Sequence, residues 1–202
     1  MWSAVLPVKR LNRAKTRLRG AVPGVSHDAL VLAIALDTIA AVAACPAIDR
    51  LVVVTAEPAL AVPARRLGAR VIPDPPEPGL NAAFRHGATA ATGPLAALTG
   101  DLPALRPAEL AAALAAATAY PRAYLPDAEA TGTVLLTALS PAHLDPHFGP
   151  GSAAAHAATG ATRLAGPWPS LRRDVDTPTN LTTATALGLG PRTTALVAAG
   201  TA

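Results

Sequence analysis

The chain has 202 residues, enough for one domain with a buried core, and 51% of them are hydrophobic although only 3% are aromatic. Its formal net charge at pH 7 is +4, and the excess positive charge comes from one segment. Because Cys45 is the only cysteine, an internal disulfide is excluded and we expect a reducing, cytoplasmic location. Cys45 lies in an alanine-rich apolar stretch, which favours a buried packing role over nucleophilic catalysis.

The basic residues gather in a loop that follows the first apolar run. They are Lys9, Arg10, Arg13, Lys15, Arg17 and Arg19. Among 17 Lys and Arg residues, only Lys9 and Lys15 are lysines. Since an ammonium and a guanidinium are not interchangeable at a phosphate site, we expect this loop to bind a polyphosphate, with a solvated charged loop as the alternative. No aromatics interleave with these charges, and no basic helix face follows, so we expect no nucleic-acid partner.

The hydrophobic pattern predicts strands that alternate with helices, and therefore one wound α/β domain with helices on both faces of the sheet. Strands are predicted over residues 2–8, 51–55, 70–72, 95–99, 122–125, 133–138 and 171–175. Helices are predicted over residues 26–45, 59–67, 81–91, 107–119, 152–159 and 179–187. The apolar stretch 29–44 contains Asp37 and is shorter than a membrane span, so we expect a buried helix and no membrane association.

Asp101 is the first acidic residue that could carry chemistry. It follows a predicted buried strand through Gly100, where an α/β protein presents side chains to its cleft. Pro103 makes the turn rigid. A turn aspartate that bonds its own backbone is an equally good interpretation.

Asp174 and Asp176 form a second acidic site. If they continue the predicted strand, both carboxylates lie on one face and Val175 is buried on the other. Two adjacent carboxylates repel each other unless a cation lies between them, and a hard divalent ion is the natural partner. Arg172 and Arg173 offer the alternative of a surface ion-pair cluster.

The sequence FGPGSAAAH, ending at His156, places Gly149, Gly151 and Ser152 at the start of a predicted helix. Backbone N–H groups and the helix dipole favour an anion there, with His156 as a second contact. Thr133 and the preceding threonine and glycine could add donors. Ordinary turn and capping chemistry is the competing interpretation.

Gly79 and Asn81 follow a proline-rich loop and open a helix, where Asn81 could cap the helix or contact a nucleotide. The sequence contains no G-x-x-x-x-G-K-[ST] and no G-x-G-x-x-G, which disfavours a P-loop or a dinucleotide-binding fold.

With these pieces in place, the chain resembles the guanylyltransferase family of coenzyme F420 biosynthesis, which guanylylates 2-phospho-L-lactate or phosphoenolpyruvate. The blocks that carry the resemblance run over nearly the whole length: LPVKRLNRAKTRL, GLNAAFRHG, LTGDLPAL, GTVLLTA, FGPGSAAAH and DVDTPTNL. The resemblance implies a single-domain, three-layer α/β/α nucleotidyltransferase fold over residues 1–202, with a mostly parallel mixed sheet.

The resemblance also implies roles for individual residues. Lys9, Lys15 and Asp101 would be catalytic, and Mg²⁺ would bind at Asp101, Asp174 and Asp176. Thr133, Gly149 and Ser152 would hold the phosphate and carboxylate of the acceptor. GTP would contact Leu6, Pro7, Val8, Lys9, Lys15, Gly79, Asn81 and Gly100.

The resemblance further implies that the product passes to the next enzyme of the F420 pathway, and it allows a homodimer. Among acceptors we favour phosphoenolpyruvate, because family members of similar Ala-, Pro-, Gly- and Arg-rich composition use it. The alternatives are a molybdopterin or sugar-phosphate nucleotidyltransferase and a non-catalytic GTP-sensing module.

Overall fold

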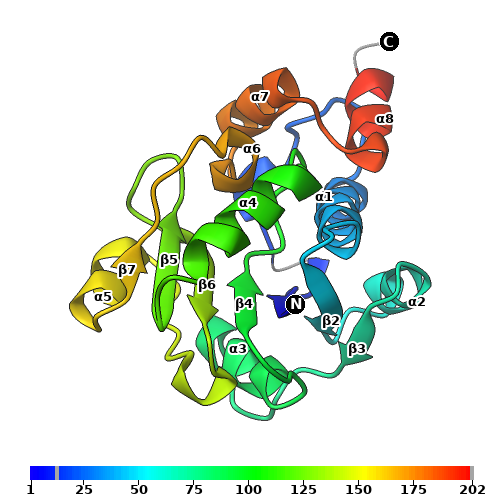
Figure 1. Ribbon diagram of the computed structural model, residues 1–202. Coiled ribbons are helices and arrows are strands. Elements are labelled where there is room, and N and C mark those ends of the chain that lie inside the picture. The colour runs from blue at the N-terminus through cyan, green and yellow to red at the C-terminus, as the bar shows by residue number, and fades with distance from the viewer. Residues whose placement is uncertain (12–13, 201–202) are drawn as a thin grey trace.

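A mixed sheet of seven strands forms the centre of the protein in a computed structural model that describes residues 1–11 and 14–200. The strands are β1 (Trp2–Pro7), β2 (Ile48–Val54), β3 (Arg70–Ile72), β4 (Leu95–Leu98), β5 (Arg122–Pro126), β6 (Thr133–Ala138) and β7 (Thr162–Arg163). Their order across the sheet is β3-β2-β1-β4-β6-β5-β7 (Figure 1). β6 runs antiparallel to both of its neighbours, and the other neighbouring pairs are parallel.

The helices join these strands and end in a helical tail. They are α1 (His27–Ala43), α2 (Pro58–Arg66), α3 (Leu80–Ala88), α4 (Pro107–Ala117), α5 (Ser152–Ala158), α6 (Pro169–Arg172), α7 (Pro178–Leu187) and α8 (Pro191–Ala199), with 3₁₀ turns η2 (Thr16–Leu18) and η3 (Pro141–His143). As predicted, Ser26 caps α1 and accepts a hydrogen bond from the N–H of Ala29 at 3.2 Å. Over residues 1–11 and 14–200, no helix combines the length and apolar character needed to cross a bilayer.

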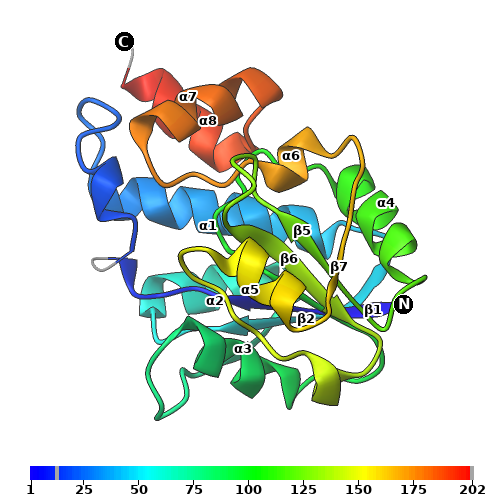
Figure 2. The same cartoon turned by 90° about the vertical axis from the view of Figure 1, so that its left-hand side faces the viewer.

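The alternation of side chains along β1 divides the core into two layers of packing. Ala4 and Leu6 face the cluster formed with α1, α2 and α4, whereas Val5 faces the cluster formed with α3 and α5. Figures 1 and 2 show the resulting arrangement, with helices covering both faces of the sheet. Cys45 is buried in the first cluster, as expected.

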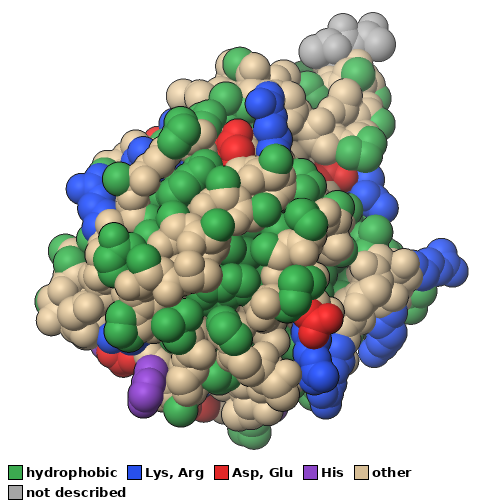
Figure 3. Space-filling view, in the orientation of Figure 1, with side chains coloured by type: hydrophobic (Ala, Val, Ile, Leu, Met, Phe, Trp, Pro, Cys, Tyr) green, Lys and Arg blue, Asp and Glu red, His purple; other side chains and the backbone are tan. Residues whose placement is uncertain are grey.

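On the face shown in Figure 3, hydrophobic side chains spread over the region of the alanine-rich helix α4, and most Lys and Arg side chains lie near the margins.

A third, smaller core joins the two ends of the chain. Leu18 and Val22 from the basic segment pack with Ile34 of α1, and with Val175 and Leu181 from the tail. This packing places the basic segment beside the segment that carries Asp174 and Asp176, although the two are far apart in sequence.

The predicted strand over residues 171–175 is wrong. Instead, Pro169 is the first residue of the short helix α6. Proline has no backbone N–H, and at this position the helix needs none. The carboxylate of Glu109 accepts hydrogen bonds from the N–H groups of Ser170 (2.9 Å) and Leu171 (3.3 Å), which have no partner within the helix. The sequence patterns also missed β7, which has only two residues, and α8. The remaining elements agree with prediction apart from shifts at their ends.

Replacing Gly87 of α3 by alanine is expected to destabilise the protein. Alanine is the better helix former by about 1 kcal/mol, but a Cβ here would overlap Val5 Cγ1 on β1 and lie 3.0 Å from Val54 Cγ2. Overpacking of about 1–3 kcal/mol therefore outweighs the propensity gain. Urea unfolding measures the loss. The double variant V5A/G87A should lose less than the sum of the single variants, because Val5→Ala removes the overlapping methyls; strict additivity would contradict the packing argument.

Candidate active site

One cavity of about 700 Å³ opens at the edge of the sheet where three central strands meet. β1 and β4 are parallel, and β6 is antiparallel to β4, so the C-terminal ends of the first two strands lie beside the N-terminal end of β6. This edge is where open α/β sheets bind ligands. The predicted site residues that line the cavity are Pro7, Val8, Lys9, Lys15, Gly100, Asp101, Thr133, Gly149, Ser152, Asp174 and Asp176.

Lys15 is the centre of the charged side of this cavity. Its Nζ donates hydrogen bonds to Asp101 Oδ2 and Asp176 Oδ1, which connects the basic segment to the turn after β4 and to the tail. Burial opposes the charge of the ammonium, but the two carboxylates outweigh burial and raise the pKa of Lys15. Lys15 has a left-handed backbone conformation, with φ of 52°, and the ring of His27 contacts the carbonyl of the preceding Ala14 at 2.8 Å. The ammonium is therefore held in place between the carboxylates.

Three predicted metal ligands converge at the same end of the cavity. The N–H of Val175 donates to the carbonyl of Asp101 at 3.0 Å, so Asp174 and Asp176 lie beside Asp101 without forming a strand. Val175 is fully buried, as predicted. Burial, followed by the negative charge of Asp101, raises the pKa of Asp174 to about 7, although Lys15 opposes the shift.

These carboxylates fit a hard divalent cation. Within the described part of the chain, Asp101 Oδ1 is buried and has no hydrogen-bond partner. Carboxylate oxygens are the ligands that such cations prefer, and Lys15 already places a positive charge between Asp101 and Asp176.

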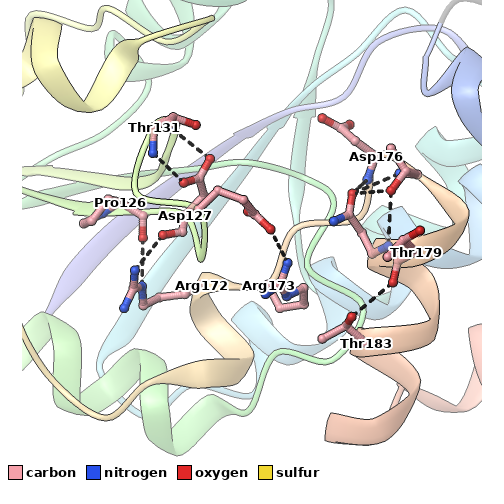
Figure 4. A network of polar contacts seen from close by, with 12 residues as sticks. Pro126, Asp127, Thr131, Arg172, Arg173, Asp176, Thr179 and Thr183 are labelled. Carbon is pink, nitrogen blue, oxygen red and sulfur yellow. Dashed lines mark hydrogen bonds and ion pairs between the residues drawn. The ribbon is translucent and has the colours of Figure 1, made fainter.

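Arg172 and Arg173 do not neutralise the acidic pair, so the surface ion-pair interpretation of these residues is wrong. Arg172 donates to the carbonyls of Pro126 (3.2 Å) and Asp127 (2.7 Å), and Arg173 pairs with Glu129 at 2.6 Å. Figure 4 shows Arg172 beside Pro126 and Asp127, on the opposite side of the view from Asp176.

The sequence patterns missed Asp127, which shapes the loop between β5 and β6. Its two carboxylate oxygens accept hydrogen bonds from the N–H groups of Thr131 (3.0 Å) and Gly132 (2.8 Å) (Figure 4). Oxygens of Asp127, Glu129 and Asp174 also lie within 4.8 Å of one another. An aspartate followed within five residues by Thr-Gly is a turn signal that could have identified this loop.

Thr133 and the glycine-rich loop before α5 contribute uncharged groups to the cavity. Gly149 and Gly151 have positive φ values of 139° and 72°, and no described residue accepts a hydrogen bond from their N–H groups. The expectation of several free N–H groups is only partly correct, because Ser152 donates to the carbonyl of Gly149 and Ala153 donates to that of Thr131, each at 3.1 Å.

Several residues of the sequence predictions do not line the cavity, among them Arg10 and Arg19 of the basic loop. Leu6 is fully buried in the core, and Gly79 precedes α3 with φ of 120°. The side-chain amide of Asn81 makes two hydrogen bonds with the backbone of Phe148. It donates to the Phe148 carbonyl at 3.0 Å and accepts from the Phe148 N–H at 2.8 Å. His156 is fully buried and does not serve as a second anion contact in this cavity. Arg13 lies outside the described residues.

Comparison with known proteins gives the class first. The MobA-like NTP transferase domain matches residues 28–168. A nucleotidyl transferase from Methanothermobacter superposes with a TM-score of 0.66 at 20% identity, covering 93% of this chain and 97% of its own. A putative nucleotide-diphospho-sugar transferase from Desulfovibrio desulfuricans gives 0.68 at 16% identity, covering 98% and 97%. The predicted nucleotidyltransferase fold is therefore confirmed.

The particular family follows from closer relatives. The phosphoenolpyruvate guanylyltransferase of Salinispora arenicola is 61% identical over 199 residues, covering 97% of this chain and 93% of the relative. That of Geodermatophilus obscurus is 56% identical over 202 residues, covering 97% and 94%. The chain belongs to the phosphoenolpyruvate guanylyltransferase family, in agreement with the resemblance in its sequence.

Replacing Asp127 by asparagine is expected to lower the free energy of unfolding by about 1–3 kcal/mol, because an amide presents one acceptor oxygen where two N–H groups need one each. Hydrogen exchange at Thr131 and Gly132 should accelerate. The matched control is Glu129→Gln, which weakens an exposed pair worth about 0–1 kcal/mol. Equal stability of the two variants in urea would contradict the role given to Asp127.

Proposed function

We propose that this chain transfers GMP from GTP to phosphoenolpyruvate, releasing pyrophosphate and forming enolpyruvoyl-2-diphospho-5'-guanosine for coenzyme F420 biosynthesis, with one nucleotidyltransferase domain over residues 1–202. The observation that carries the proposal is that Lys15 and three carboxylates line one cavity together with Thr133 and the 149–152 loop. The names of the relatives supply the identities of the two substrates.

The two sides of the cavity suit two different groups. The N–H groups of Gly149 and Gly151 and the hydroxyls of Thr133 and Ser152 can donate to the phosphate and carboxylate of the acceptor. Lys9 and Lys15 can bind the GTP phosphates, and Pro7, Val8 and Gly100 line the same cavity.

Asp101, Asp174 and Asp176 would hold Mg²⁺, which when bound would neutralise the negative charge of the phosphates. The nucleophile is an oxygen of the acceptor's phosphate, which is already ionised at neutral pH, so the reaction needs no protein base. The oxygen attacks the α-phosphorus of GTP in line, the bond to the β-phosphate oxygen breaks, and pyrophosphate leaves. The protein's task is to hold two anions together against their repulsion, which requires positioning and positive charge.

The first test mixes the protein with GTP, Mg²⁺ and one acceptor at a time: phosphoenolpyruvate, 2-phospho-L-lactate or 3-phosphoglycerate. The next F420-pathway enzyme is present as a trap for a labile product. We expect pyrophosphate release and a guanylylated product, identified by mass spectrometry, with phosphoenolpyruvate. Turnover with a sugar phosphate or molybdopterin instead, or GTP binding without any turnover, would contradict the proposal.

Asp101→Asn and Lys15→Arg should each lower kcat/KM by about 100-fold or more, because each changes a charged contact at the reacting phosphates. Lys15→Arg keeps the charge but replaces a compact ammonium by a planar group, so this variant tests the lysine argument directly. The matched controls are Asp49→Asn and Arg50→Lys, at exposed positions on β2. Far-ultraviolet circular dichroism should show intact folds. Near-normal turnover in either site variant would remove the role proposed for that residue.

A further inference from the structure

His156 is fully buried behind the cavity, where both of its ring nitrogens make a hydrogen bond. The backbone N–H of His147 donates to Nε2 at 2.9 Å. On the other side of the ring, Nδ1 lies 2.9 Å from the hydroxyl oxygen of Thr133. The mechanism proposed above assigns no task to this histidine.

These two contacts fix the tautomer of the ring. A backbone N–H can only donate, so Nε2 must be unprotonated. A neutral imidazole carries one proton, which therefore lies on Nδ1 and is donated to the Thr133 oxygen. Burial, followed by electrostatic repulsion from the neighbouring His147 and Arg122, lowers the pKa of His156 to about 4 although Asp145 opposes the shift, so the ring is neutral at pH 7.

The surroundings of the ring hold it in this orientation. Phe148 contacts it edge-on, with 5.2 Å between the ring centroids, and Tyr124 lies at 6.0 Å. Phe148 is itself held by the side-chain amide of Asn81. The loop before α5 thus supplies both Phe148, which packs against the ring, and the N–H of His147, which bonds to it.

The tautomer of His156 determines which way the Thr133 hydroxyl can donate its proton. Its oxygen accepts the Nδ1 proton, and its own hydroxyl proton remains to be donated toward the cavity that Thr133 lines. We propose that His156 is a positioning residue that sets the Thr133 hydroxyl as a hydrogen-bond donor to an anionic oxygen of the acceptor, an inference that rests on the proposed function. Such a donor favours a fully ionised phosphate or carboxylate oxygen over a hydroxyl group at the same place.

A double-mutant cycle between His156 and Thr133 tests this proposal. His156→Phe keeps a buried ring of similar shape but removes the Nδ1 donor, and it should raise KM for phosphoenolpyruvate about tenfold while KM for GTP changes less than about twofold. Thr133→Val should raise the same KM. In the Thr133→Val background, His156→Phe should add less than about a further twofold, because it acts through the hydroxyl.

Two conservative variants serve as controls. His156→Asn places an amide N–H near the position of Nδ1 and should recover part of the affinity for phosphoenolpyruvate. Thr133→Ser keeps the hydroxyl and should resemble the wild type more closely than Thr133→Val does. Thermal unfolding establishes that each variant is folded at the assay temperature. Equal losses from His156→Phe with and without the Thr133 hydroxyl, or a matching rise in KM for GTP, would show a merely structural role and overturn the proposal.

Nitrogen-15 NMR of the wild-type protein without substrates gives an independent readout. We expect one pyrrole-like Nδ1 and one pyridine-like Nε2 for His156, and the reverse assignment would overturn the proposal. Failure of the proposed function is distinguishable, because the wild type would then transfer no GMP to phosphoenolpyruvate while this tautomer assignment remained measurable. An active wild type whose KM for phosphoenolpyruvate is unaffected by His156→Phe would instead refute the role of His156 alone.

Discussion

The balance between carboxylates and one ammonium group determines the arrangement of this site. A backbone hydrogen bond from Val175 to the Asp101 carbonyl brings Asp101 and Asp174 together. Because Asp174 is largely buried, the negative charges of the two carboxylates repel each other. Lys15 counters that repulsion and joins the N-terminal segment to the tail. Because the small core around Leu18 packs the same two segments together, the hydrophobic contacts and the charge pairing stabilise one geometry.

The direction of β6 gives the cavity its second side. A parallel strand at this position would present its C-terminal end, whereas the antiparallel β6 presents Thr133, its first residue, beside the ends of β1 and β4. The tight loop before it is closed by the Asp127 carboxylate and attached to α6 through Arg172. The C-terminal tail therefore contributes to the cavity in two ways: α6 holds the β5–β6 loop, and the residues after α6 supply Asp174 and Asp176.

The sequence predicted the parts of the site that depend on local patterns. A buried strand ending in Gly-Asp located Asp101, and the restriction of lysine to one loop pointed to Lys15. The acidic pair was found, but its predicted strand was wrong because Pro169 and the distant Glu109 favour a helix start there. Ser152 and His156 do share one helix face, yet that face is buried, with His156 between Thr133 of β6 and Tyr124 of β5, and the sequence contains no signal that a histidine at helical spacing turns inward.

In the proposed function, two groups of residues lining the cavity would recognise their ligands in different ways. Around Lys15 and the three carboxylates the interactions would depend mainly on charge, so a polyphosphate accompanied by a cation would be bound with little sensitivity to its exact shape. Around Thr133, recognition would depend on donors whose directions are fixed by the protein: two glycine N–H groups and a hydroxyl that contacts His156. A hydrogen bond to a charged group contributes about 1.5–3 kcal/mol, or roughly ten- to a hundredfold in affinity. In the proposed function, the oriented donors would therefore bind the phosphate and carboxylate that distinguish a phosphorylated acid from other phosphates, and the buried histidine, although remote from the reacting phosphorus, would contribute to binding the acceptor.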